Sequence, residues 1–574
     1  MKKGVFVAGL LLTVFTTTAT AQSNWVEKFL NRYRPPILDP ASTLTPQVSD
    51  TPWRSMVDSG RLPISVTDII RLMLGSNLDV TVNRFSPLAT QYLIQTLFRP
   101  FEPTLDISAT VRRSTVPTAS QLVGAAALTQ LNHIYAIGYG QTLQAGTRLD
   151  VSFGINRNSS NSVFSTFNPS YSGNITYAVN QPLLRNFGRD INGAQIRIAR
   201  HNLNLSAIDF ETQMIELVTN AQNLYWDLVF QREDIKVRKQ SLELAEKTLR
   251  DNKRQVEIGT MAPIEVVQAE SEVAQRQEQM VTTSYTADQT QDRIKRLITN
   301  LGDPAMVAAQ LDPMEPPQRP GPNDVMRLED AIKYALESRP ELRQLSLQLQ
   351  NSEVEMQYNK NQLLPSLNVN ASYTQNGVGG VQTIRSGLGG GPILSVTRGG
   401  LADAFGQLFG YDFTGYSVGF NLSIPLSNKS VQAEYSRALT NKQAIEARRN
   451  RLSQQIALDV RNAQSLVDMN RARIEAAEKA LQLANMQLAA EQKKFQLGTS
   501  QIRFVLEEQR NVTAAQTSQI QALVNYAKAL VDYDKAVGRT LRKNNIEIEK
   551  QMQIAGDDRS RSPLLKQEGW LRHQ

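Results

Sequence analysis

Side chains that commonly carry out catalysis or bind metals are scarce in this sequence. Its 574 residues include three histidines and no cysteine. His133, His201 and His573 are far apart along the chain and match neither a metal-ligand spacing nor a catalytic triad. Carboxylates are plentiful, but they lie in long periodic segments that carry no pocket motif. The sequence therefore predicts a protein that is not an enzyme, with no cofactor and no metal site.

The overall composition excludes several other functions. Without cysteine there are no disulfides, no thiolate catalysis, no cysteine-based zinc sites and no lipid anchor on an N-terminal cysteine. The 62 Lys and Arg residues against 54 Asp and Glu residues give a net charge of +8. Spread over this length, that excess differs from the clustered basic surface of a nucleic-acid-binding protein. With 41% hydrophobic residues, the chain is also too apolar to be wholly disordered.

The N-terminus has the three parts of a secretory signal peptide. Two lysines follow the first methionine, residues 5–15 are apolar, and residues 19–21 have the A-x-A cleavage pattern. The apolar run is shorter than the roughly 20 residues that a membrane-spanning helix needs. We therefore expect cleavage between Ala21 and Gln22 and export of the mature chain.

Four landmarks recur in the same order in the two halves of the chain. They are an amphipathic helix start at Thr67–Leu72 and Glu329–Tyr334, a Pro-x-Leu segment at Pro103 and Pro365, a Pro-Leu pair at Pro182 and Pro425, and a Gly-Thr pair at Gly259 and Gly498. An internal duplication explains the length as two copies of one plan, which consists of a helix, strands and a long helical hairpin.

This plan divides the chain into six segments. They are a signal peptide at 1–21, an N-terminal extension at 22–64, a first repeat at 65–302, a Pro-rich linker at 303–323, a second repeat at 324–541 and a polar C-terminal tail at 542–574. The linker contains six prolines, which argue against helix there and favour a stiff connection.

Strict alternation of apolar with small or polar residues predicts β-strands in both halves. Val418, Phe420 and Leu422 alternate with serine, glycine and asparagine. The same alternation occurs at 105–111, 135–139, 149–155, 175–179 and 367–371. One interpretation is an ordinary antiparallel sheet with one buried face. In an exported chain the other interpretation is a barrel with lipid outside and water inside, and the small polar residues favour it. One chain has too few strands to close a wide pore, so several chains would have to share it.

Glycine- and serine-rich segments separate some of the strands. Residues 377–400 and 158–165 are the clearest examples, and we expect them to form long external loops.

Residues 192–256 and 430–497 predict two very long helices. The first contains a single glycine and no proline, and the second contains neither residue. At 1.5 Å per residue, such helices reach about 95–100 Å. Their apolar residues step by three and four, as at Leu452, Ile456 and Val460, which indicates coiled-coil packing. These helices alone would also fit a generic coiled-coil rod, but a rod leaves the strands unexplained.

Each long helix leads into a Gly-Thr pair, Gly259-Thr260 or Gly498-Thr499. Glycine accepts the left-handed conformation that ends many helices, and a threonine hydroxyl can cap the next helix. The pairs therefore predict the turns of two helical hairpins. A purely structural role is one interpretation, and a partner contact or gate at the far end of the helices is the other.

The combined features resemble the TolC-like outer-membrane efflux family. The residues that carry the resemblance are the signal peptide, the duplicated halves, Leu363-Leu364-Pro365-Ser366-Leu367, the strand ends Gln181-Pro182-Leu183-Leu184 and Ile424-Pro425-Leu426, and the Gly-Thr turns. The resemblance covers residues 65–541. It implies a mixed α and β, all-antiparallel fold, in which three chains each give four strands to one transmembrane β-barrel. Their helices would form a long coiled-coil α-helical barrel.

Two positions in the sequence bear on this implied fold. Pro182 and Pro425 would mark the passage from strand to helix. The alternating residues 132–157 depart from the four-strand plan, either as an extended hairpin or as longer strands.

The function implied by the resemblance is passive export through the outer membrane of a Gram-negative-type bacterium, with a long periplasmic part. The implied partners are two further copies in a homotrimer, a periplasmic adaptor (membrane fusion protein), an inner-membrane pump that acts through the adaptor, and outer-membrane lipid. Nucleic acid is not among them. The alternative is a periplasmic coiled-coil adaptor or a structural envelope protein without a pore. An adaptor would need an inner-membrane anchor or a lipid-bearing cysteine, and neither is found.

The resemblance also implies roles for particular residues. The adaptor would dock near the hairpin tips, at Gly259, Thr260, Gly498 and Thr499. Acidic residues shortly after these turns form constricting rings in some members. Glu265 and Glu507 are the candidate gate or pore carboxylates here, and threefold symmetry would turn each into a ring that attracts cations.

Overall fold

The computed structural model describes residues 60–118, 124–298, 304–387 and 391–548, together with positions 33, 53, 56 and 57. The chain divides into two compact units, one of Met56–Glu547 and one of Met1–Ser55 with Ile548–Gln574. All elements below belong to the first unit. The predicted cleavage point between Ala21 and Gln22 lies outside the described residues.

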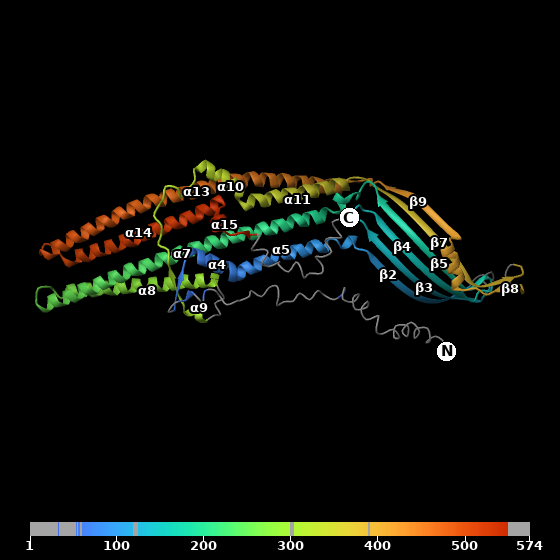
Figure 1. Ribbon diagram of the computed structural model, residues 1–574, viewed down its shortest axis with the longest axis horizontal. Helices are drawn as coiled ribbons and strands as arrows, with labels where there is room; N and C mark the ends of the chain where they lie inside the picture. Colours follow the sequence, from blue (N-terminus) through green and yellow to red (C-terminus); the bar gives the residue numbers. More distant parts are fainter. Residues whose placement is uncertain are drawn as a thin grey trace. The chain divides into compact units, whose positions relative to one another are not determined.

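Two antiparallel helical hairpins dominate the unit. The first consists of α7 (Ala194–Glu257) and α8 (Ile264–Ile298), and the second of α13 (Lys429–Gln496) and α14 (Ile502–Val537). Figure 1 shows each pair lying side by side, with the turns at the end away from the sheet. Both predicted long helices are confirmed. Among the described residues, none of the helices combines the length and the apolarity that crossing a bilayer requires.

Shorter helices precede the strands in each half. They are α4 (Val66–Ser76) and α5 (Leu78–Thr96) in the first half, and α10 (Leu328–Ser338) and α11 (Pro340–Gln362) in the second. A capping box starts α4, because the Asp68 backbone N–H donates to Ser65 Oγ at 3.1 Å and the Ser65 N–H donates to Asp68 at 3.1 Å. The short elements are η2 (Arg99–Phe101), α6 (Arg189–Asn192), α9 (Pro304–Ala308) and α15 (Thr540–Lys543).

The helices pack through the apolar positions that the sequence indicates. Ile456, Val460 and Val467 of α13 are fully buried and form one cluster with Tyr526 and Tyr533 of α14. Stepping by three and four places these residues on one side of α13, so burial of that side holds the second hairpin together.

The Pro-rich linker contains regular structure, so the expectation that residues 303–323 exclude helix is wrong. Pro304 opens α9, where a proline costs no hydrogen bond because its N–H would lack an intrahelical partner in any case. Next in the chain, β6 (Gln310–Pro313) pairs with β1 (Arg61–Ile64) in parallel. This pair also corrects the all-antiparallel fold class, since the whole first half serves as the crossover that parallel strands need.

The main sheet is antiparallel throughout. Its strands are β2 (Thr104–Pro117), β3 (Ala127–Thr142), β4 (Arg148–Ser160), β5 (Phe167–Pro182), β7 (Ser366–Arg385), β8 (Ile393–Thr397) and β9 (Phe413–Ser423). The order is β2-β3-β4-β5-β7, and β8 and β9 both pair with β7 at different heights. Within the described residues the sheet is open, with β2 and β9 as its long edges (Figure 1).

The sheet contains more than the four strands per chain that the resemblance implies. All its described strands except the five-residue β8 have 11 residues or more, which makes six long strands in one chain. The difference arises at residues 127–160, where the alternating segments form β3 and β4 between β2 and β5. These segments pair along nearly their whole length, so they are full members of the sheet.

Residues 377–400 are also not the loop that their glycines predict. β7 continues to Arg385, β8 follows, and α12 (Leu401–Gly410) then packs on β7 and β5. A Cβ on Gly377 would lie 2.0 Å from the Ala404 carbonyl oxygen, and one on Gly379 would lie 2.2 Å from that of Gly400. The glycines therefore serve close packing of a helix on a strand.

Candidate functional site

The two hairpin tips have the same backbone geometry. Gly259 and Gly498 are left-handed, with φ of 78° and 76°. The Gly259 N–H donates to the Val256 carbonyl at 3.0 Å, and the Thr260 N–H donates to Gln255 at 2.9 Å. The second tip repeats both bonds at Phe495 and Lys494, at 2.9 and 3.0 Å. This is the Schellman ending, in which a left-handed glycine lets the chain satisfy the last carbonyls of the helix.

The threonines of the tips cap the preceding helix and not the following one. Thr260 Oγ1 donates to the Gln255 carbonyl at 3.0 Å, and Thr499 Oγ1 donates to the Lys494 carbonyl at 3.0 Å. The expectation that they cap the next helix is wrong, because α8 and α14 begin only at Ile264 and Ile502. The hydroxyls thus lie beside the last turns of α7 and α13.

The second tip has a charged anchor of its own. Glu491 accepts hydrogen bonds from the Ser500 hydroxyl and, at 3.0 Å, from Lys494 Nζ. The bond from Ser500, followed by that from Lys494, lowers the pKa of the Glu491 carboxyl. In the first tip a buried asparagine, Asn252, instead donates to the Glu265 carbonyl at 3.5 Å. The two tips are therefore alike in backbone geometry and differ in the side chains that bond to them.

The candidate carboxylates lie in different surroundings. Glu265 is in the first turn of α8, and its Oε2 is buried without a hydrogen-bond partner among the described residues. Glu507 is exposed on α14. Among the described residues, no hydrogen bond or ion pair joins the two carboxylates.

The two prolines stand where strands end. Pro182 is the last residue of β5, is buried and lies opposite Asn368. Pro425 is exposed and follows the end of β9, a few residues before α13 begins.

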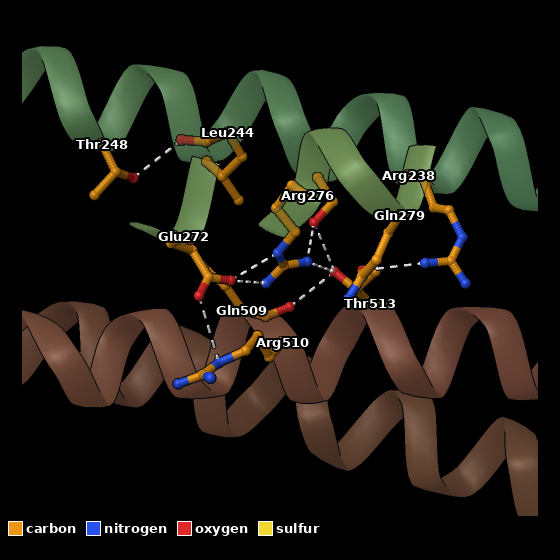
Figure 2. Close-up of polar contacts among 10 residues, drawn as sticks. Arg238, Leu244, Thr248, Glu272, Arg276, Gln279, Gln509, Arg510 and Thr513 are labelled. Atoms are coloured by element: carbon orange, nitrogen blue, oxygen red, sulfur yellow. Dashed lines mark hydrogen bonds and ion pairs between the residues drawn. The ribbon is translucent and has the colours of Figure 1, made fainter. Parts of the chain in front are cut away.

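A buried polar cluster joins the two hairpins. It was not predicted from the sequence. Arg276 of α8 bonds Glu272 on its own helix, with Nε to Oε1 at 2.7 Å. Its Nη1 donates to Ser241 of α7 and, at 3.2 Å, to Thr513 of α14. Arg510 of α14 approaches the second oxygen of Glu272 at 3.8 Å. Figure 2 shows the Arg276 side chain directed from α8 toward α14, between Glu272 and Thr513.

A second set of contacts extends the cluster along α7. Asp234 is buried and accepts from Arg238 Nε at 2.6 Å and from the Thr517 hydroxyl at 2.7 Å. Arg238 also donates to Gln279 Oε1 of α8 at 3.1 Å (Figure 2). We call the seven residues Asp234, Arg238, Ser241, Glu272, Arg276, Thr513 and Thr517 the interhairpin cluster.

The interhairpin cluster borders a cavity of about 480 Å³. The side chains of Arg276 and Glu272 are only 6% and 8% exposed, so their charges are largely removed from water. Removing one partner of such a pair leaves an uncompensated buried charge, which costs about 3–5 kcal/mol. Since Arg276 is twelve residues into α8, the cluster lies about 18 Å from the helix start near the tip. It can hold the hairpins together, but it has no arrangement suited to catalysis.

A weak signal for this cluster exists in the sequence. Ala269, Glu272 and Arg276 step by three and four along α8, and all are buried. A charged residue on the buried face of a helix needs a partner, because burying an unpaired charge is costly. Such residues therefore indicate a partner on another helix. The partner helix, α14, lies more than 220 residues further along the chain, so the sequence alone did not identify it.

Comparisons with known proteins agree with this architecture. The profile of the family described as outer membrane efflux protein matches residues 69–300 and 331–539. The pyoverdine export outer membrane protein OpmQ of Pseudomonas aeruginosa is 24% identical over 351 residues, which span 60% of this chain and 66% of OpmQ.

Solved structures show the same fold at low identity. The CmeC outer membrane channel of Campylobacter jejuni is 15% identical with a TM-score of 0.59, and the match covers 89% of this chain and 92% of CmeC. VceC of Vibrio cholerae is 13% identical with a TM-score of 0.57, over 85% of this chain and 98% of VceC. Because the family profile matches most of its length, the chain belongs to the outer membrane efflux protein family, whose members are TolC-like channels.

Proposed function

We propose that three copies of this chain form a channel that passively exports substrates across the periplasm and the outer membrane. A periplasmic adaptor would dock at the hairpin tips, and an inner-membrane pump would act through it. The signal peptide would be removed after Ala21 on export. The two profile matches also support two copies of one structural plan.

The observation that carries this proposal is a sheet with one apolar face and one polar face, whose strands lead into two long helical hairpins. Residues paired across the six long strands form one row: Leu105, Tyr139, Val151, Tyr177, Tyr373 and Tyr416. The neighbouring row on the other face is Asp106, Gly138, Ser152, Thr176, Thr374 and Gly415. An apolar, aromatic-rich face opposite a small and polar face suits a wall between lipid and a water-filled lumen.

The interhairpin cluster supports a gate at the periplasmic end. Arg276 joins the α7–α8 hairpin to α14, so movement of the second hairpin must break its bond to Thr513 and the bond between Ser241 and Thr513. A few buried polar bonds can hold the two hairpins in one arrangement. Breaking these bonds leaves the apolar packing within each hairpin intact. We infer that opening moves the hairpins as units.

Purification in detergent and reconstitution test the proposal. We expect the mature protein to run as a trimer and to conduct ions in planar bilayers. A stable monomer without conductance would overturn it and would favour a structural envelope protein.

The partners need a separate measurement. We expect crosslinking in cells to recover an adaptor at the tips and a pump beyond it. Crosslinks from residues beside Gly259 and Gly498 that reach only outer-membrane proteins would contradict the docking role.

A further inference from the structure

This chain has two more long strands, β3 and β4, than the four strands per chain that the resemblance implies. Their position in the sheet determines the width of the channel. We propose that β3 and β4 belong to the membrane-spanning wall, and that β9 of each copy pairs with β2 of the next. Three copies of six long strands then close a sheet of eighteen. This inference rests on the proposed trimeric channel.

The pairing of β3 and β4 with their neighbours is continuous. β3 pairs with β2 from Thr104↔Gly140 to Pro117↔Ala127, which is the whole length of β2. β4 pairs with β3 over thirteen positions and with β5 over eleven, and none of these three ladders contains a bulge. At 16 and 13 residues, β3 and β4 exceed the roughly 9–11 residues that a tilted strand needs to cross a bilayer.

β3 and β4 also continue the apolar face and the polar face of the neighbouring strands. Tyr135 and Ile137 of β3 lie opposite Ile155 and Phe153 of β4, on the same apolar face as Ile107 of β2. A single shift of register would reverse these faces. A hairpin outside the wall would have no reason to continue the lipid-facing and lumen-facing alternation of its neighbours.

The turn between β3 and β4 is built into the junction where β5 leads into α7. The Gly188 N–H donates to the Ala145 carbonyl at 3.1 Å, and Arg189 donates to Gln144 Oε1 at 3.3 Å. Gly146 has a φ of 94°, and a Cβ there would lie 2.6 Å from the Asn186 carbonyl oxygen. The hairpin is therefore fixed at the base of the sheet and cannot swing away from it.

The two edges suit a second copy of the chain. With six strands in alternating directions, β2 and β9 are antiparallel to each other, so β9 of one copy can continue into β2 of the next. Both edges expose apolar side chains, including Ile107 at 73% and Phe420 at 80%. Head-to-tail pairing of two different edges closes into a ring.

The consequence concerns the cargo. The diameter of such a sheet grows about linearly with strand number, so eighteen strands widen the twelve-stranded plan by about half. Closed sheets of about 16–18 strands leave an open aqueous channel. The outer-membrane part would then not limit the cargo, and selection by size would occur at the hairpins.

Direct imaging of the trimer in lipid nanodiscs tests the strand number. We expect eighteen strands in the wall. Twelve strands with β3 and β4 outside the wall would overturn the inference. A preparation that neither trimerises nor conducts would instead overturn the proposed function, so the two failures can be told apart.

Engineered cysteines give a second test, because the chain has none of its own. Ser108→Cys with Ala136→Cys joins paired positions of β2 and β3, and we expect a disulfide within each membrane-inserted chain. Ser108→Cys with Asn174→Cys would join β2 to β5 only in a four-strand wall, so a disulfide there would contradict the inference. Ser417→Cys combined in turn with cysteine at positions 106, 108 and 110 should link neighbouring copies, and no linkage in any of the three would contradict the edge pairing.

Discussion

At the scale of single residues, one buried arginine links the two hairpins. Arg276 reaches Thr513 across the interface, and Glu272 and Ser241 within its own hairpin. A buried ion pair of this kind adds little net stability compared with apolar packing, because both charges lose their hydration. Its value is geometric, since the guanidinium fixes which turns of α8 and α14 face each other.

The first prediction concerns this guanidinium. Arg276→Met keeps the apolar stem but leaves Glu272 without its main partner, so we expect a loss of about 3–5 kcal/mol and a lower melting temperature. Planar-bilayer recordings should show a larger open fraction. The double variant Arg276→Met with Glu272→Leu should recover stability but keep the larger open fraction.

A control on the same hairpin is available. Arg250 of α7 has a side chain that is 64% exposed and lies 3.9 Å from Glu246. Arg250→Ala should change stability by less than about 1 kcal/mol and leave gating unchanged. Equal open fractions for Arg276→Met and the native channel would refute a holding role for the interhairpin cluster.

The second prediction concerns pH at the second tip. Since folding lowers the pKa of Glu491, its bonds to Ser500 and Lys494 stabilise the tip above the ordinary carboxyl range. That contribution disappears as the pH falls through the lowered pKa. Amide hydrogen exchange at residues 494–501, corrected for intrinsic rates, should therefore rise on acidification. In Glu491→Gln the exchange should be independent of pH, and an identical acid response in both proteins would contradict the assignment.

At the scale of elements, the hairpin turns depend on one backbone conformation. An added Cβ at Gly498 would meet nothing within 4 Å, so a substitution there acts through φ alone. The left-handed region costs a β-branched residue about 1–3 kcal/mol, whereas asparagine enters it more easily.

The third prediction follows from this difference. Gly498→Val should distort the Schellman ending, weaken adaptor coupling and reduce export in a complementation assay at equal abundance. Gly498→Asn should retain most of the activity. Full export by Gly498→Val, with normal abundance, would show that the tip geometry is not needed for coupling.

The strands show how far local patterns determine elements. Alternation at 135–139 and 149–155 predicts two strands in a place where the resemblance to the family provides none, and the sheet contains both. The glycines of residues 377–400 were misleading, because glycine signals a loop and close packing equally well. Only the position of α12 against Gly377 and Gly379 distinguishes the two.

At the scale of the whole molecule, threefold symmetry would multiply every lumen-facing charge. Glu265 lies at the first turn of α8, beside the tip, and has one buried oxygen without a partner among the described residues. Three such carboxylates around one axis would form a ring that favours cations.

The fourth prediction tests this ring. Glu265→Lys should shift the reversal potential of the trimer toward anions in a salt gradient, and Glu265→Gln should shift it by a smaller amount in the same direction. The same pair of changes at Glu507, on the exposed side of α14, tests the second candidate. An unchanged reversal potential for all four variants would place both carboxylates outside the conduction path.

The sequence by itself determined the features that depend on neighbouring residues. The long helices, the alternating strands and the left-handed glycines of the tips all follow from backbone geometry and side-chain periodicity over a few residues. Only the tertiary structure decided the contacts that cross the chain. Arg276 meets Thr513, β1 pairs in parallel with β6, and β5 of the first half pairs with β7 of the second. These contacts join residues that are remote in sequence, and their energies depend on burial and register, which no local pattern specifies.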